Sequence, residues 1–133
     1  MDRNLRAHFE QVIARAHAHL TSVEIAQNDV TPRRAILEVH GTFRDFDVRI
    51  KEIFAASGNL YSYYLLGAGT VIVGWDNYTD LRVIKMKFGN QFKRHMDDLI
   101  PHRHGYGKKT VELTSGFTAE KFLERLEQFS SDV

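Results

Sequence analysis

The chain has 133 residues, of which 43% are hydrophobic and 26% are charged, and its formal net charge at pH 7 is +1. These values fit one globular domain over residues 1–133 and exclude a disordered chain, and the lack of cysteine excludes disulfide bridges, thiolate metal sites and cysteine nucleophiles. We expect a cytoplasmic protein without membrane association, because no apolar run approaches the roughly 20 residues of a spanning helix and no signal-peptide pattern is present.

The first predicted element is an amphipathic helix over residues 4–20, with Asn4 as its N-cap. Its apolar side chains recur at spacings of three and four and therefore share one face: Leu5, Phe9, Val12, Ile13, Ala16 and Leu20. We expect this face to pack on a sheet formed by the residues that follow.

Residues 22–77 predict strands, because apolar and polar residues alternate there between clusters of turn-forming residues. The expected strands cover residues 22–27, 35–42, 46–54, 60–66 and 70–75. Their short connections indicate antiparallel neighbours. The predicted fold class is therefore α+β: an antiparallel sheet of about five strands with an N-terminal and a C-terminal helix packed on it.

The stretch after the fifth strand is less regular. Residues 83–88 are compatible with a strand, and residues 91–100 predict a helix that Pro101 ends. Residues 109–113 are compatible with another short strand. A final helix is predicted after a Thr118 cap, with an inward face of Phe122, Leu123, Leu126 and Phe129.

Glu52 lies on the face of its strand that should be buried, since it follows Val48 and Ile50 at a spacing of two. An unpaired buried carboxylate is costly, so we expect a cationic or hydrogen-bond-donating partner for it. The alternative is a β-bulge that turns Glu52 towards solvent.

Aromatic and polar side chains mark the next two strands. Tyr61 and Tyr63 share one strand face, where aromatic residues most often serve packing. The following strand ends in Trp75-Asp76-Asn77, and Asp and Asn in this position are typical of an Asx-turn. The alternative is that Asp76 orients a histidine and Asn77 holds a substrate oxygen.

The most specific local motif is Pro101-His102-Arg103-His104. In an extended backbone, His102 and His104 project to the same side, so their imidazoles can converge while Arg103 faces away. Convergent imidazoles suit acid–base catalysis or metal binding, and the plainer alternative is a pair of exposed loop histidines. The candidates for a third metal ligand are His95, Asp97, Asp98 and Asp76.

Basic residues dominate the same part of the sequence. Between residues 82 and 109, only Asp97 and Asp98 oppose a run of cations: Arg82, Lys85, Lys87, Lys93, Arg94, Arg103, Lys108 and Lys109. Such a stretch can contact phosphates, and it is equally compatible with a solvated surface.

From about Phe46 onward, the chain resembles the TumE-like family of toxins from prokaryotic toxin–antitoxin modules. The resemblance depends on an ordered series: a strand ending in Glu52, then Tyr61-Ser62-Tyr63, Trp75-Asp76-Asn77, Pro101-His102-Arg103-His104 and a terminal amphipathic helix. The chain departs from the family pattern at two places. A basic insertion over residues 78–100 precedes Pro101, and Arg103 stands where a further His and a Lys are usual.

The resemblance implies a toxin that acts on RNA and that has a cognate antitoxin as its protein partner. The leading hypothesis is a metal-independent endoribonuclease in which His102 and His104 form the base–acid pair, because an RNA 2′-hydroxyl can attack its own phosphate. The supporting roles would be these: Glu52 or Asp76 fixes an imidazole tautomer, Arg103, Lys108 and Lys109 stabilise phosphate charge, and Tyr61, Tyr63 and Asn77 bind substrate.

Two alternatives stay open at this point. In a metal-dependent phosphodiesterase or nucleotide-modifying enzyme, His95, His102 and His104 would ligate a divalent metal. In a non-catalytic protein-interaction module, the histidines would be incidental. The edge strands of a small sheet often pair between chains, so a homodimer is a further expectation.

Overall fold

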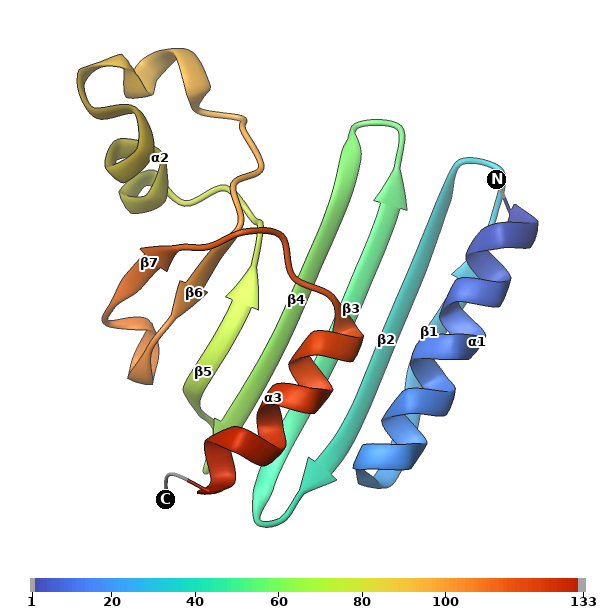
Figure 1. Ribbon diagram of the computed structural model, residues 1–133. Helices are drawn as coiled ribbons and strands as arrows, with labels where there is room; N and C mark the ends of the chain where they lie inside the picture. The colour runs from blue at the N-terminus through green and yellow to red at the C-terminus, as the bar shows by residue number, and fades with distance from the viewer. Residues whose placement is uncertain (1, 132–133) are drawn as a thin grey trace.

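The computed structural model describes residues 2–131, and the side chains of residues 4–128 among them (Figure 1). The helices are α1 (Asp2–His19), α2 (Leu81–Phe88) and α3 (Ala119–Ser131), with two 3₁₀ helices, η1 (Gly89–His95) and η2 (Tyr106–Lys108). The strands are β1 (Thr21–Val30), β2 (Arg34–Phe43), β3 (Phe46–Ala55), β4 (Gly58–Gly67), β5 (Thr70–Asp76), β6 (His102–His104) and β7 (Val111–Leu113). Over residues 2–131 the strands form one antiparallel sheet in chain order, from β1 at one edge to β7 at the other. The predicted α+β class is confirmed.

Helices α1 and α3 pack on one face of this sheet, as Figure 1 shows. Their predicted inward faces are confirmed, because one core contains Phe9, Val12, Ala16, Leu20, Phe122, Leu123 and Leu126 together with buried strand residues. The side chain of Phe129 lies outside the described residues. The Thr118 hydroxyl accepts a hydrogen bond from the Lys121 amide at 3.2 Å, as a cap should. The predicted Asn4 cap is wrong, since α1 begins at Asp2.

The sheet contains two strands more than the five predicted for residues 22–77. Strand β7 falls within the 109–113 segment, whereas β6 is the histidine motif itself, paired with the end of β5. Each of these strands has three residues, which is too short for an alternating hydrophobic pattern to develop. Their pairing with an existing edge supplies the backbone hydrogen bonds that they could not form alone.

The segment between β5 and β6 differs from its prediction. Residues 83–88 belong to helix α2, which an Asp80 side chain caps by accepting a hydrogen bond from the Arg82 amide at 2.9 Å. The predicted helix over 91–100 is instead η1, which ends at His95, well before Pro101. Their apolar residues form a separate small core in which Val83, Ile84 and Ile100 are buried, with Phe88, Phe92 and Val111 packed against them.

Strand register determines which side chains meet on each face of the sheet. Ser62 is paired with both Lys51 and Asp76, and Asp76 is paired with His102, so these residues share the face opposite α1 and α3. Their neighbours alternate to the helix-covered face. Within residues 2–131, no helix is long and apolar enough to cross a bilayer.

Candidate metal centre

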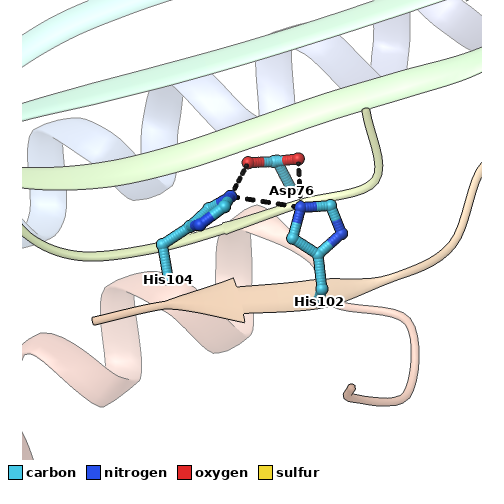
Figure 2. Close-up of side chains that lie close together, drawn as sticks. All are labelled: Asp76, His102 and His104. Carbon is cyan, nitrogen blue, oxygen red and sulfur yellow. Dashed lines mark hydrogen bonds and ion pairs between the residues drawn. The ribbon is translucent and has the colours of Figure 1, made fainter. Parts of the chain in front are cut away.

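Asp76, His102 and His104 come together at the junction of β5 and β6 (Figure 2). Nε2 of His102 lies 3.0 Å from Asp76 Oδ1, and Nε2 of His104 lies 3.2 Å from Asp76 Oδ2. The two Nε2 atoms lie 3.1 Å apart. All three side chains are buried, with exposed fractions of 1–3%. The predicted convergence of the two imidazoles is therefore confirmed, and Asp76 is the third member of the cluster.

The local sequence explains this convergence. Strand β6 pairs His102 with Asp76 and His104 with Gly74, so both histidines point to the same face of the sheet as Asp76. Gly74 is required beside them, because a Cβ at this position would lie 1.7 Å from the ring of Tyr64. The Tyr64 ring can therefore lie across Gly74 and donate its hydroxyl to Asp76 Oδ2.

The Asp76 carboxylate accepts hydrogen bonds on both oxygens. Tyr78 donates its amide to Oδ1 at 2.9 Å, which is the predicted Asx-turn, and Tyr64 donates its hydroxyl to Oδ2. Burial alone would raise the pKa of Asp76, but the hydrogen bonds from His102, His104 and Tyr64 outweigh it and hold the pKa far below its usual range. Burial and the bond to Asp76 also raise the pKa of Tyr64, so the phenol stays a donor.

The proton positions on His102 follow from its partners. Its Nδ1 lies 2.7 Å from the carbonyl oxygen of Ile100, which can only accept, so Nδ1 holds a proton. Nε2 of a neutral His102 would then direct a lone pair at the Asp76 carboxylate. Burial opposes charge on this ring, but the bonds to Asp76 and Ile100 prevail and raise the pKa of His102. Either a proton or another cation is thus favoured beside Nε2.

When Nε2 of His102 also carries a proton, either tautomer of His104 leaves an unfavourable contact or an unpaired group in the cluster. If His104 also donates from Nε2 to Asp76, two N–H groups face each other across 3.1 Å. If His104 instead holds its proton on Nδ1, its Nε2 lone pair faces the carboxylate, and Nδ1 has no hydrogen-bond partner among the described residues. One cation bound by both Nε2 atoms and the carboxylate would remove these contacts between like groups, with the His104 proton on Nδ1.

The distances suit such a cation. Three ligand atoms about 2.1 Å from one ion, at angles between 90° and tetrahedral, lie roughly 3.0–3.4 Å from one another. The contacts in the cluster are 3.0, 3.1 and 3.2 Å. Two imidazoles and one carboxylate are a common donor set for catalytic zinc and other divalent transition metals. The Ile100 carbonyl and the Tyr64 hydroxyl would be the outer partners that orient His102 and Asp76.

The same geometry is unfavourable for an acid–base pair acting on one phosphate. In-line displacement puts the attacking and leaving oxygens on opposite sides of phosphorus, so the base and the acid should also lie on opposite sides. The Nε2 atoms of His102 and His104 are instead in contact with each other and with one carboxylate. The arrangement favours the metal-ligand role of this motif over its acid–base role.

The cluster lines a pocket of about 390 Å³ that also contains three basic side chains: Lys51, Arg82 and Lys108. Arg82 is paired with Asp80 at 3.2 Å and donates to the carbonyl of Lys108 at 3.0 Å, which ties α2 to η2 across the pocket. Lys108 Nζ lies 4.8 Å from the centre of the Tyr64 ring. A pocket of this size, lined by three potential metal ligands and three cations, suits a phosphate-containing ligand.

Three of the predicted site residues lie on the other face of the sheet. Glu52 is buried under the helices, as the period-two pattern predicts, and the bulge alternative is excluded because β3 pairs in register around it. Its partners are His8 Nε2 at 2.6 Å and the Tyr63 hydroxyl at 2.5 Å. The Tyr61 ring stacks on Tyr63, and its hydroxyl accepts a bond from the Phe117 amide. The structure does not bring Glu52, Tyr61 or Tyr63 to the histidine cluster.

Asn77 and Arg103 also have other partners. The Asn77 side chain accepts a bond from the Tyr61 amide at 2.9 Å and donates to the Asn59 carbonyl at 2.8 Å, so it joins the ends of β4 and β5. Arg103 faces away from the histidines, as expected for the middle residue of the motif. It is bound to Glu112 at 2.8 Å and lies over the Trp75 ring.

The remaining candidates separate into near and distant positions. Lys108 lines the pocket, whereas Lys109 is exposed and does not line it. His95 stacks on Phe88 and is paired with Asp98 at 2.8 Å. Among the described residues, the only group of three or more potential ligands close enough to hold one ion is Asp76, His102 and His104. Neither His95 nor the Asp97-Asp98 pair belongs to it.

The sequence-based reasoning did not name Tyr64, Lys51 or Arg82 as site residues, although it included Arg82 in a basic stretch that can contact phosphates. The sequence contained a usable signal for two of them, because successive side chains of a strand point to opposite faces of the sheet. The Tyr64 side chain therefore points to the face opposite that of Tyr61 and Tyr63, and the Lys51 side chain to the face opposite that of Glu52. Once Asp76 is placed on that face, Tyr64 and Lys51 are its neighbours. Arg82 had no such signal, since the neighbouring residues 83–88 were compatible with a strand and helix α2 was not predicted.

Comparisons with protein-family models, with curated proteins and with solved structures gave no significant match for this chain. The likeness to TumE-like toxins therefore stays a prediction from sequence motifs.

Proposed function

We propose that this chain is a metal-dependent phosphodiesterase that cleaves RNA at the centre formed by Asp76, His102 and His104. The observation that supports it most is the set of contacts of 3.0–3.2 Å among three buried ligand groups in a pocket with a basic rim. A divalent ion held there would polarise a phosphoryl oxygen and supply an activated water.

The chain's own residues would prepare the substrate for that chemistry. Lys51, Arg82 and Lys108 would bind the phosphate and stabilise the charge that develops on its oxygens. The Tyr64 hydroxyl would hold the Asp76 carboxylate in its binding orientation, and the Ile100 carbonyl would keep the His102 proton on Nδ1. The Nε2 atom of His102 is thereby available to the ion.

The biological role in this proposal is that of a toxin from a toxin–antitoxin module, with a cognate antitoxin as partner. It is supported by the ordered series of motifs that resembles the pattern of TumE-like toxins. Asp76, His102 and His104 belong to these motifs. The metal-independent endoribonuclease is the competing mechanism, and the raised pKa of His102 beside Asp76 is the observation in its favour.

The test is RNA cleavage by protein from which metal has been removed, with and without added Zn²⁺ or Mn²⁺. His104→Ala should be inactive under all conditions, whereas His95→Ala, which changes a histidine outside the cluster, should behave as wild type. We expect cleavage only after metal is restored. Cleavage at full rate by metal-free wild type would favour the acid–base mechanism, and intact RNA under all conditions would contradict the nuclease function.

A further inference from the structure

The segment between β5 and β6 has an unusual charge distribution. Residues 81–96, which we call the cationic segment, comprise α2, η1 and Met96, and they contain no aspartate or glutamate. Their basic residues are all exposed: Arg82, Lys85, Lys87, Lys93 and Arg94. A concentration of one sign of charge produces a local potential that attracts a polyanion, even though the net charge of the whole chain is only +1.

These charges are largely not neutralised by the protein. Among the described residues, a carboxylate partner is found for Arg82 alone of the five, through Asp80. Lys85 lies over the ring of Phe92 at 4.9 Å, and Lys87 lies over the ring of Phe88 at 5.5 Å. Contacts with aromatic faces orient an ammonium group without cancelling its charge. The segment therefore presents positive charge to solvent.

The cationic segment is also held in a fixed position. Its small core buries Val83 and Ile84 against Ile100, and the His95 ring stacks on Phe88 with ring centres 3.5 Å apart. Met86 and Met96 remain about half exposed among the cations, at 52% and 46%. Exposed methionines provide apolar contacts that adapt to flat ligands such as bases.

Both ends of the segment lead into the proposed active site. Asp80 and Arg82 at its start line the pocket, and Ile100, shortly after its end, orients His102 through its carbonyl. Figure 1 shows α2 and the turns after it beyond the β6–β7 end of the sheet, on the side away from α1. Arg82 thus belongs both to the cationic segment and to the lining of the pocket.

We propose that the cationic segment binds the backbone of the RNA strand that flanks the cleaved phosphate, an inference that depends on the function proposed above. The pocket of about 390 Å³ is near the small end of ligand sites and holds only the nucleotides at the reacting bond. The rest of a longer strand must lie outside it, where exposed cations without a carboxylate partner among the described residues can contact its phosphates. The segment gives the enzyme a preference for polymeric RNA over small diesters.

The experiment compares two ligands in the whole 133-residue chain: RNA binding is measured in metal-depleted protein, which should leave the RNA intact, and diester hydrolysis in metal-loaded protein. Binding of a fluorescent 20-nucleotide single-stranded RNA is measured by anisotropy at several salt concentrations, and hydrolysis of bis(p-nitrophenyl) phosphate reports on the metal centre alone. The test variant is Lys93→Ala/Arg94→Ala, and the matched control is Lys121→Ala/Arg125→Ala, which removes two exposed cations from α3 on the helix-covered face. Lys93→Arg/Arg94→Lys preserves the charge.

We expect the test variant to bind RNA at least tenfold more weakly and to lose about 1.4 from the slope of log affinity against log salt, because each phosphate contact on a single strand contributes about 0.7. Diester hydrolysis should change less than twofold, and both the control and the charge-preserving variant should bind as wild type. Unchanged RNA affinity and slope in the test variant would overturn the inference. Salt-dependent binding without cleavage of either substrate would instead contradict the proposed function and leave the binding surface supported.

Discussion

His102 and His104 direct their Nε2 atoms at each other across 3.1 Å, with the Asp76 carboxylate in contact with both. Two histidines held in this way cannot stand on opposite sides of a phosphate. His102 keeps a proton on Nδ1 for the Ile100 carbonyl, so the Nε2 atom of a neutral His102 directs its lone pair at the Asp76 carboxylate. This relationship supports the divalent ion proposed for the cluster.

Tyr64→Phe should weaken zinc binding without unfolding the protein. The change removes only the hydroxyl that orients Asp76, and loss of an outer partner of this kind typically costs 10–100-fold in metal affinity. Calorimetric titration with Zn²⁺ measures the effect. Tyr61→Phe is the matched control, since Tyr61 lies on the same strand but on the helix-covered face. Equal zinc affinity in the two variants would exclude an orienting role for Tyr64.

Lys108→Ala should lower kcat/KM for RNA cleavage by about tenfold, because it removes one cation from the pocket rim. Zinc affinity should be unchanged, since Lys108 contacts the Tyr64 ring rather than a ligand atom. Lys109→Ala changes the adjacent exposed residue, and its kcat/KM should stay within twofold of wild type. If both variants lose activity equally, the η2 loop contributes general charge rather than a specific phosphate contact.

Glu52→Ala should reduce stability and leave zinc binding intact. The substitution leaves the buried Tyr63 hydroxyl without its acceptor, at a cost of about 2 kcal/mol. For a domain of this size, the expected fall in Tm is roughly 5–10 °C in a thermal melt. Glu52→Gln retains an acceptor and should lose less. A variant that stays folded and binds zinc but cleaves no RNA would show that Glu52 has a catalytic role from the opposite face.

Sequence patterns were sufficient for most of the fold. The helix faces of α1 and α3 and the strands β1–β5 follow directly from hydrophobic periodicity, because each is long enough for several repeats. Strand β6 could not be predicted in this way, since its three residues gain their conformation by pairing with β5. Helix α2 depends on the Asp80 cap and on burial against Ile100, which is a tertiary contact that local propensity does not reveal.

The candidate site was predictable only in part. The spacing of His102 and His104 predicts their convergence, and Asp76 was among the expected partners. The register that pairs Asp76 with His102 depends on strand assignments that the sequence left open. Glu52 and Tyr63 were grouped with the histidines because motif order does not reveal which face of a sheet each residue occupies. Strand parity separates them once the pairing is known.

The measurement that tests the central claim most directly is equilibrium dialysis of metal-depleted protein against Zn²⁺, with the bound metal quantified for wild type, His104→Ala and His95→Ala. We predict one zinc ion per chain in wild type and in His95→Ala, and loss of that ion in folded His104→Ala. Absence of bound zinc in wild type, or equal binding by His104→Ala, would contradict a metal centre at Asp76, His102 and His104.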